Sequence, residues 1–371
     1  MRLVLVIDSL GGGGAERVMA TLAETWCKKG HDVTLVTIAP ASASFYEIAP
    51  EIRYVPLGLS SVSLSLLDTA RNNLRKVRAL RETIQGARPD CVVSFTDKTN
   101  LQVLLSLLGK RIPTVVSERI DPTQRWIGAV LEGLRGLLYP TASVLVVQTE
   151  RVAVWGKRVM RRKPVIVIPN PALRRPVSGE AAGCTVPPGS RLIVGMGRLT
   201  HQKGFDLLLR AFAKVAHESP GWSVVILGEG EARAQLESLA DELAIGKRVS
   251  FPGQLTHPEA LLRQAEIFVL PSRFEGFPNA LLEAMAQGCA VISADCPSGP
   301  AEIVVSGQNG LLVPPQDVAK LAEALSSLMG DEGTRKRLGR SAVDVLERYS
   351  LERCIDLWEG ALHQAVYSHV H

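Results

Sequence analysis

The chain alternates between short apolar runs and longer stretches in which apolar residues recur at helical spacing. The runs are rich in β-branched residues and too short for buried helices, which favours strands buried on both faces. Each gap leaves room for a crossover helix, and this alternation is typical of a doubly wound parallel sheet. The expected strands are Leu3–Ile7, Val33–Ile38, Cys91–Phe95, Thr114–Val116, Val144–Val147 and Val165–Ile168, then Leu192–Gly195, Val224–Leu227, Val249–Phe251, Ile267–Leu270, Val291–Ser293 and Leu311–Val313.

The strand pattern occurs twice, and a proline- and glycine-rich stretch with little hydrophobic periodicity separates the two sets. We therefore predict an α/β protein with a Rossmann-like domain at 1–170, a linker at 171–190 that permits hinge closure, and a second Rossmann-like domain at 191–345. The helical pattern from Leu346 to Val366 predicts a further helix within 346–371.

Charge is distributed unevenly between the two halves. The 371 residues carry a net charge of +5, but Met1 to Asn170 contain 23 Lys and Arg against 14 Asp and Glu, and the remainder contains 19 against 23. Nucleic acid is disfavoured as a partner because interleaved aromatic residues are few and no nucleic-acid motif is present. An anionic acceptor or a membrane surface fits the basic half better.

Composition also bears on the compartment. No apolar stretch approaches the roughly 20 residues that span a bilayer, and the opening Met1–Asp8 predicts a strand instead of a signal peptide. The six cysteines show neither a CxxC motif nor zinc-ligand spacing, which favours free thiols in a reducing cytoplasm. We expect a cytoplasmic protein, with contact to the inner face of the cell membrane left open.

Two carboxylates follow one of the expected strands. After Ile267–Leu270, a loop rich in Gly and Pro carries Glu275, and the helical pattern that starts near Pro278 carries Glu283. In open α/β sheets, ligands bind beyond the carboxyl ends of strands, where helix N-termini favour anions. This segment is therefore the main candidate for a binding site.

Cations follow a second expected strand. Arg198 and Lys203 come directly after Leu192–Gly195. The planar fork of an arginine grips two phosphate oxygens and a lysine adds a point charge, so the pair is suited to hold a diphosphate without a metal. Two solvated charges at a loop are the ordinary alternative.

The four glycines Gly11–Gly14 follow the first strand and open a helix. They do not form a dinucleotide fingerprint, because either register requires a third glycine where Glu16 or Arg17 stands. A NAD-dependent enzyme is therefore disfavoured. The loop is either a structural turn or a place where backbone N–H groups approach a ligand.

These motifs together resemble the family-4 retaining glycosyltransferases, which have the GT-B fold: two Rossmann-like domains that face one another across a cleft. The resemblance rests on Gly197-Arg198-Leu199 with Lys203-Gly204, on Glu275-Gly276-Phe277 and the seven-residue gap to Glu283, and on the glycine loop. Phe251-Pro252-Gly253, Ile168-Pro169-Asn170 and the stretch from Tyr349 to Trp358 extend it over nearly the whole chain.

The resemblance implies roles for individual residues. Arg198 and Lys203 would bind the donor diphosphate and stabilise the leaving group, Glu275 would contact the transferred sugar, and Glu283 would accept hydrogen bonds from the ribose. The tail at 346–371 would cross back to the first domain. The implied donor-binding set is Gly13, Gly14, Arg198, Lys203, Gly253, Glu275, Gly276, Phe277, Pro278, Asn279 and Glu283, of which Arg198, Lys203 and Glu275 are the catalytic candidates.

The acceptor side departs from the family pattern. Many relatives carry a histidine after the fourth expected strand, whereas this chain has Glu118 and Arg119, which are acceptor candidates with a buried structural ion pair as an equal alternative. Arg71, Arg75 and Arg78 recur at helical spacing and would hold an acceptor pyrophosphate or form a solvated face. The basic stretch after Trp155 and the amphipathic 126–138 would contact anionic lipid or serve as ordinary packing and surface.

We therefore expect a metal-independent, retaining glycosyltransferase that requires no cofactor. It would move a hexose or N-acetylhexosamine from a UDP-sugar to a glycan acceptor, carried on a polyprenyl diphosphate, with α linkage. Paired carboxylates also suit glycoside hydrolysis, but the nucleotide-type motifs disfavour it. The alternatives are a nucleotide-sugar epimerase or phosphorylase of the same fold and a nucleotide-binding module without catalysis.

Overall fold

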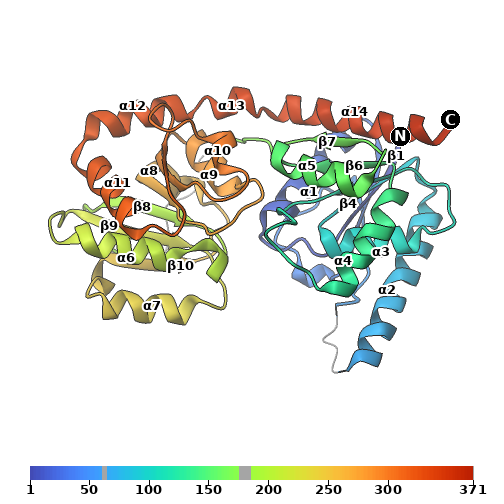
Figure 1. Cartoon of the computed structure of the whole chain (residues 1–371), viewed down its shortest axis with the longest axis horizontal. Helices are drawn as coiled ribbons and strands as arrows, with labels where there is room; N and C mark the ends of the chain where they lie inside the picture. Colours follow the sequence, from blue (N-terminus) through green and yellow to red (C-terminus); the bar gives the residue numbers. More distant parts are fainter. Residues whose placement is uncertain (61–64, 175–184, 371) are drawn as a thin grey trace. The chain divides into compact units, whose positions relative to one another are not determined.

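The computed structural model describes residues 1–60, 65–174 and 185–370. The chain divides into two compact units, Met1–Asn170 with Glu352–His371, and Pro171–Leu351. Figure 1 labels many of the helices and strands of both. Part of the predicted linker at 171–190, namely 175–184, lies outside the described residues.

Within the described residues, the amino-terminal unit contains a seven-stranded parallel sheet in the order β3-β2-β1-β4-β5-β6-β7. The order reverses between β1 and β4, as in a doubly wound sheet. The strands are β1 (Arg2–Ile7), β2 (Asp32–Thr37), β3 (Arg53–Pro56), β4 (Cys91–Phe95), β5 (Thr114–Ser117), β6 (Val144–Val147) and β7 (Val165–Val167). The helices are α1 (Gly14–Lys28), α2 (Leu66–Ala87), α3 (Asp97–Ser106), α4 (Ala129–Leu138), α5 (Glu150–Met160) and α14 (Leu351–Val370), with 3₁₀ turns at Ala41–Ala43 and Tyr139–Thr141.

The carboxyl-terminal unit contains a six-stranded parallel sheet, within the described part of the chain, in the order β10-β9-β8-β11-β12-β13. The strands are β8 (Arg191–Met196), β9 (Trp222–Leu227), β10 (Val249–Gly253), β11 (Ala265–Leu270), β12 (Ala290–Ala294) and β13 (Leu311–Val313). The helices are α6 (Phe205–Ala216), α7 (Arg233–Glu242), α8 (Glu259–Gln264), α9 (Asn279–Ala286), α10 (Pro300–Ile303), α11 (Val318–Gly330), α12 (Glu332–Ala342) and α13 (Val345–Arg348), with 3₁₀ turns η3 (His201–Lys203) and η4 (Gly246–Arg248).

Both faces of this second sheet are buried. On β8, Ile193 faces a cluster that contains residues of α6, α7 and α11, and its neighbours Leu192 and Val194 face a cluster with residues of α8 and α9. Because neither face meets water, the strands are continuous apolar runs, which is why they were visible in the sequence. The predicted fold class, with two Rossmann-like parallel-sheet domains, is confirmed.

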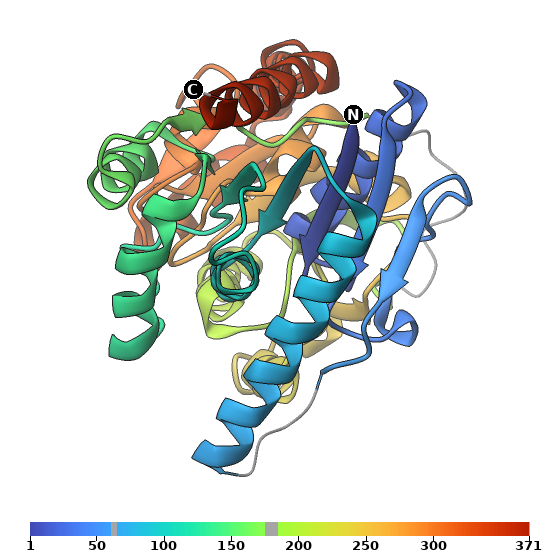
Figure 2. The same cartoon turned by 90° about the vertical axis from the view of Figure 1, so that its right-hand side faces the viewer.

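Helix α14 packs on the amino-terminal sheet. The ring of Trp358 lies edge-on to Trp26 of α1 at 6.2 Å and stacks on Phe95 of β4 at 5.6 Å. In the same unit, the long helix α2 extends past the ends of the strands that it covers (Figure 2).

Two expectations about elements were wrong. The edge strand β3 was not predicted, because it is short, ends in Pro56 and is exposed at both ends. The single helix expected over Leu346–Val366 is two helices, α13 and α14, with a break at Tyr349 and Ser350. The break is fixed by the Tyr349 hydroxyl, which donates to the carbonyl of Glu302 at 2.7 Å, and serine is a preferred residue at a helix start.

Candidate active site

The candidate site lies at the carboxyl ends of β8 and β11. These two strands pair in parallel, and the strand order of the second sheet reverses between them. In an open α/β sheet this point is a crevice in which ligands bind. The loop after β8 carries Arg198 and Lys203, and the loop after β11 carries Glu275, so the sheet brings both motifs to one edge.

A glycine allows the two loops to approach closely. Gly204, between η3 and α6, has a φ of +66°, and a Cβ at this position would lie 2.2 Å from the carbonyl oxygen of Pro271. Any side chain would therefore be strained and would also collide with backbone. The sequence Lys203-Gly204 thus places Lys203 directly beside the loop that follows β11.

Lys203 and Glu275 form an ion pair at this junction. The Lys203 Nζ donates to Glu275 Oε1 at 2.6 Å, and the Ser272 hydroxyl donates to the same oxygen at 2.6 Å. The side chains are only 15% and 6% exposed. A hydrogen-bonded pair this far from water holds both side chains in one geometry.

A second set of contacts ties the same two loops together. The guanidinium of Arg273 donates to both carboxylate oxygens of Asp206, at 2.8 and 2.7 Å. The Arg273 backbone N–H donates to the carbonyl of Gln202 at 2.8 Å. Sequence analysis did not single out Ser272, Asp206 or Arg273, because an isolated Ser, Asp or Arg carries no motif of its own.

Helix α9 begins directly after this loop. Pro278 is its N-cap and Asn279 its first residue, and Phe277 is buried with its ring 5.3 Å from that of Tyr349. Glu283 lies in the second turn and is half-buried, while Leu282 and Met285 on the same helix are buried. The apolar residues thus fix the helix, and Glu283 is left at its border with solvent.

A second glycine, Gly299, allows close packing against the loop after β11. A Cβ on Gly299, whose φ is +93°, would lie 2.4 Å from the carbonyl oxygen of Gly276. The nearby Cys296 thiol is buried, and burial with the neighbouring Glu275 charge raises its pKa to about 12. Gly253 ends β10 and is buried with a φ of +84°, and its carbonyl accepts from the N–H of Gly228 at 2.9 Å.

Arg198 and His201 differ from Lys203 in exposure. Both side chains are exposed. The His201 carbonyl accepts a hydrogen bond from Arg273 at 2.8 Å, so the backbone of His201 helps to hold the two loops together. Arg198 lies on the loop between the end of β8 and η3, and its contact with a diphosphate stays a prediction.

The glycine loop of the amino-terminal unit is folded tightly. Gly13 is the N-cap of α1 and Gly14 its first residue, and the Gly13 N–H donates to Gly11 at 2.8 Å. The Tyr46 hydroxyl donates to the carbonyl of Gly13 at 3.2 Å. A Cβ on Gly13 would lie 2.3 Å from a carboxylate oxygen of Glu16, so the loop has no room for a side chain unless Glu16 moves.

Glu118 and Arg119 are both buried but have separate partners. Tyr139 donates to Glu118, and Arg135 lies 3.5 Å from the same carboxylate, whereas Arg119 donates to Asn170. Glu118 is thus paired with Arg135 and not with Arg119, which was the ion pair considered from the sequence. Burial raises the pKa of Glu118 to about 7 and lowers that of Arg119 to about 9. Their contact with an acceptor stays a prediction.

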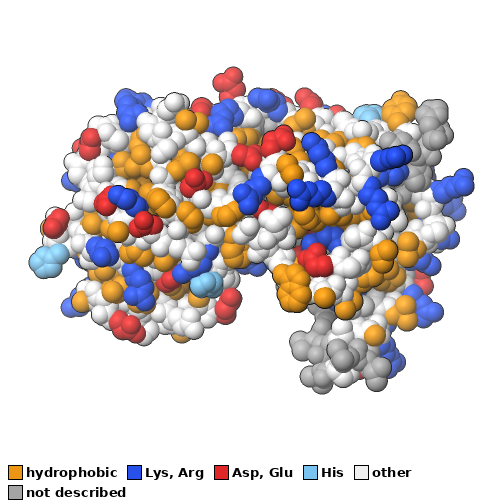
Figure 3. Space-filling view, viewed as in Figure 1, with side chains coloured by type: hydrophobic (Ala, Val, Ile, Leu, Met, Phe, Trp, Pro, Cys, Tyr) orange, Lys and Arg blue, Asp and Glu red, His pale blue; other side chains and the backbone are white. Residues whose placement is uncertain are grey.

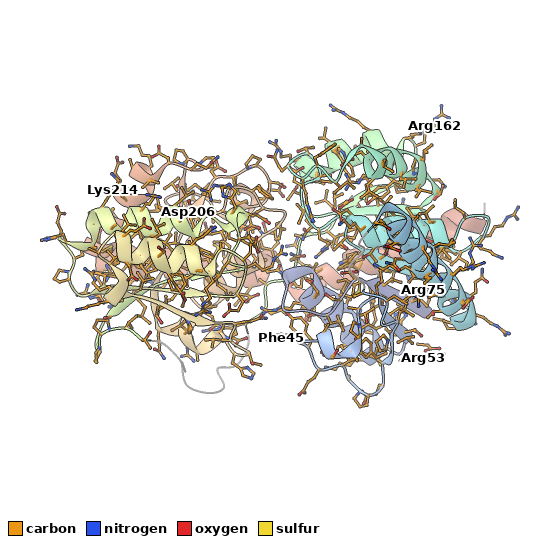
Figure 4. The ribbon with its side chains drawn as sticks, turned by 90° about the horizontal axis from the view of Figure 1, so that it is seen from below. Phe45, Arg53, Arg75, Arg162, Asp206 and Lys214 are labelled. Atoms are coloured by element: carbon orange, nitrogen blue, oxygen red, sulfur yellow. The ribbon has the colours of Figure 1, made fainter. Side chains whose placement is uncertain are left out.

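The three arginines of α2 are at the surface. Arg71, Arg75 and Arg78 are exposed, and Figure 4 labels Arg75 on this helix. Arg75 also lines a small hollow with Asn72 and with residues 58–60, which follow β3. Their role toward an acceptor stays a prediction as well.

The two tryptophans considered for lipid contact are placed differently. Trp155 is half-buried, with its ring 6.3 Å from Tyr139 and 5.5 Å below the guanidinium of Arg135, so it belongs to the core. Trp126 is exposed. Across the described ranges, no helix combines the length and apolar character needed to cross a membrane, and no cluster of three or more His, Cys, Asp or Glu suited to a metal ion is found.

Two protein-family models match the chain. The model described as "Glycosyl transferase 4-like domain" matches residues 13–171, and the model described as "Glycosyl transferases group 1" matches residues 183–344. Together they cover most of the chain, one for each parallel sheet.

Similar proteins support the same assignment. The chain is 27% identical over 359 residues to a protein of Campylobacter jejuni, with 96% of this chain and 97% of the relative covered. That relative is the "GalNAc-alpha-(1->4)-GalNAc-alpha-(1->3)-diNAcBac-PP-undecaprenol alpha-1,4-N-acetyl-D-galactosaminyltransferase".

Two solved structures share the fold. Sucrose-phosphate synthase from Thermosynechococcus elongatus has a TM-score of 0.82 at 20% identity, covering 99% of this chain and 100% of that one. Anabaena HepE in complex with UDP and glucose has a TM-score of 0.78 at 18% identity, covering 98% and 99%. At these identities the likeness extends to the fold alone.

Proposed function

Because the chain belongs to the glycosyltransferases that join a glycosyl transferase 4-like domain to a group 1 domain, we propose that it moves a hexose or N-acetylhexosamine from a UDP-sugar to a glycan acceptor carried on a polyprenyl diphosphate. The transfer retains the configuration of the donor and forms an α linkage. The observation that carries the proposal is the Lys203–Glu275 pair at the point where the second sheet reverses its strand order.

The donor is held by the two loops and helix α9. Lys203 and Arg198 bind the diphosphate, where fixed cations stabilise the negative charge that grows on the leaving group. Glu283 accepts hydrogen bonds from the ribose hydroxyls, and Glu275 contacts the transferred sugar. In this assignment the protein's own cations meet the phosphate charge, so the reaction is independent of a metal.

UDP is favoured as the nucleotide because a relative of the same fold was solved with UDP and glucose. A polyprenyl diphosphate is favoured as the acceptor carrier because the Campylobacter relative acts on a glycan linked to undecaprenyl diphosphate. The amino-terminal half carries the positive charge that such an acceptor requires, and Arg71, Arg75 and Arg78 of α2 place three exposed cations on one helix.

A lipid-linked acceptor implies work at a membrane, and α4 together with Trp126, which precedes it, supplies an apolar surface for it. Trp126, Val130 and Leu137 are 77%, 77% and 71% exposed. The charged residues of α4 are not on this face, because Arg135 is buried and donates to Glu132 at 2.9 Å. We propose that this face inserts shallowly into the bilayer.

Basic side chains lie next to this apolar face. Between residues 122 and 163 the chain has eight Lys and Arg against two Asp and Glu, and all the cations except Arg135 are exposed. Figure 3 shows hydrophobic side chains at the surface near α4 and Lys and Arg side chains near α5, and Figure 4 labels Arg162 just beyond α5. The combination fits an anionic bilayer, because each Lys or Arg near such a surface contributes about 1 kcal/mol.

The proposed reaction is tested by incubating the purified protein with a panel of UDP- and GDP-sugars, first alone and then with extracted lipid-linked glycans. We expect nucleotide release from one UDP-sugar, rising sharply when the lipid acceptor is added. Turnover of donor without acceptor would instead indicate an epimerase or phosphorylase, and nucleotide binding without any release would indicate a binding module.

The ribose assignment has its own test. Glu283→Ala is expected to weaken UDP binding in calorimetry, whereas Glu242→Ala, which removes an exposed glutamate from α7 of the same unit, is expected to leave it unchanged. Equal UDP affinity in the two variants would refute the role of Glu283.

A further inference from the structure

We propose that Asp206 and Arg273 act as a positioning pair that holds Lys203 against Glu275 in the geometry required for transfer. The inference rests on the proposed function for the roles of Lys203 and Glu275. It adds two residues that belong to no recognised motif and that act through these neighbours without touching the substrate.

The side chain of Arg273 joins the two loops by three hydrogen bonds. Its guanidinium donates to Asp206 Oδ1 at 2.8 Å, to Asp206 Oδ2 at 2.7 Å and to the carbonyl of His201 at 2.8 Å. A two-pronged contact between a guanidinium and a carboxylate fixes direction as well as distance. Asp206 lies in the first turn of α6 (Figure 4), so the fork connects the loop after β11 to this helix.

The backbone continues the same connection. The Arg273 N–H donates to the carbonyl of Gln202 at 2.8 Å, and the Gln202 side-chain amide donates to the carbonyl of Phe274 at 3.0 Å. Lys203 follows Gln202 directly, and Glu275 follows Phe274 directly. The two catalytic candidates are therefore each one residue away from a cross-loop hydrogen bond.

Asp206 and Arg273 also neutralise each other's charge. Burial alone would raise the pKa of Asp206, but the hydrogen bond from Arg273 and its positive charge together outweigh burial, and the net pKa is lowered. The hydrogen bond to Asp206 raises the pKa of Arg273. Both groups are thus charged at neutral pH and neutralise each other, so neither competes for Lys203 or Glu275.

This arrangement separates positioning from binding. The two terminal nitrogens of Arg273 already donate to Asp206 and to the His201 carbonyl, and its Nε is buried, so the guanidinium is committed to joining the loops. If the Asp206–Arg273 pair is broken, the loops after β8 and β11 can shift relative to each other, while Glu283 on α9, the proposed ribose ligand, stays in place. A misplacement of about 1 Å is enough to cost on the order of 100-fold in rate when the reacting groups must be held in line.

The second sheet offers a matched control at the amino end of β11, opposite to the candidate site. Glu266, at the start of β11, accepts from Arg335 Nε at 2.7 Å, and Arg335 Nη2 lies 2.7 Å from the same oxygen. Its side chain is 39% exposed, against 34% for Asp206. Asp206→Ala and Glu266→Ala therefore each remove a similarly exposed carboxylate from an arginine, but only Asp206 is near Lys203.

The test compares these two variants with the unaltered protein in kcat, UDP affinity, thermal stability, and hydrogen exchange of the peptides that span 197–206 and 270–279. Asp206→Ala is expected to lower kcat about tenfold with UDP affinity within about twofold, and to speed exchange in both peptides. Glu266→Ala is expected to leave kcat and both peptides unchanged. Arg273→Lys, which keeps the charge but loses the fork, is expected to fall between.

Three results overturn the proposal: full turnover in Asp206→Ala, unchanged exchange in both peptides, or equal losses of kcat in Asp206→Ala and Glu266→Ala. The exchange measurement needs no activity. If the unaltered protein transfers no sugar from any donor, the proposed function fails, whereas the exchange comparison still decides whether the pair holds the two loops.

Discussion

Replacing Lys203 by methionine is expected to destabilise the carboxyl-terminal unit, and replacing Glu275 by glutamine in the same chain is expected to recover most of the loss. Lys203 is 15% exposed and Glu275 is 6% exposed. Removing the lysine therefore leaves the Glu275 carboxylate without its cation at a place that water reaches poorly. Removing one partner of a buried pair costs about 3–5 kcal/mol. The lower value, about 3 kcal/mol, applies because Ser272 continues to donate to Glu275 at 2.6 Å.

The assay is calorimetric unfolding of the two single variants and the double variant, with the transition of the carboxyl-terminal unit identified in the unaltered protein by its shift with UDP. A loss of about 3 kcal/mol lowers the melting temperature by roughly 6–12 °C in a unit of this size. The double variant is expected to melt closer to the unaltered protein than Lys203→Met does. The reasoning is refuted if Lys203→Met loses less than about 1 kcal/mol, or if the losses of the single variants simply add in the double variant.

Three further predictions concern other parts of the chain. Gly204→Ala is expected to lower the free energy of unfolding by at least about 1–2 kcal/mol because of the positive φ alone, and by more because the new Cβ meets the Pro271 carbonyl; a denaturant titration measures this loss. The control is Gly330→Ala, at the end of α11, where a Cβ would meet open space. Equal losses in the two variants would contradict the close approach. The folded-state pKa of Glu118, about 7, lies above its ordinary value, so the folded state holds this proton more tightly and stability is lost as pH rises from about 4.5 through 7. Glu118→Gln is expected to flatten that fall in melting temperature, and an unchanged pH profile would contradict the assignment. Trp126→Asp is expected to reduce cosedimentation with vesicles containing phosphatidylglycerol several-fold, whereas Tyr367→Asp on α14, which also removes an exposed aromatic ring, is expected to leave it unchanged. Loss in both variants, or in neither, would count against the proposed membrane surface.

The parallel strands were predictable because each is buried on both faces and is therefore an uninterrupted apolar run. All the strands expected from the sequence are found, including the short β13 (Leu311–Val313). The edge strand β3 has a partner strand on one side alone, and with Arg53 and Pro56 at its ends its sequence is not an apolar run and resembles a loop. The break between α13 and α14 was missed for a related reason, because Tyr349 and Ser350 do not interrupt the helical periodicity.

For the site, the sequence indicated which loops matter but not which contacts they make. Lys203 and Glu275 follow two strands that are far apart in the chain, and only the pairing of β8 with β11 brings them within 2.6 Å. Asp206 and Arg273 could not be recognised in advance, because a single charged residue in a loop is usually solvated. Their pairing depends on the distance between two loops, which Gly204 sets through its contact with Pro271.

The ion pair between Lys203 and Glu275 has a consequence for small anions. Because Lys203 is already paired with a tethered carboxylate, an arriving phosphate must share the ammonium with Glu275 and gains only part of its attraction. A ligand that offers only phosphate competes poorly with a partner held in place at high effective concentration. A ligand whose nucleoside binds elsewhere in the site does not depend on this attraction alone, so the same contact that orders the loops also disfavours inorganic phosphate as an occupant of the site.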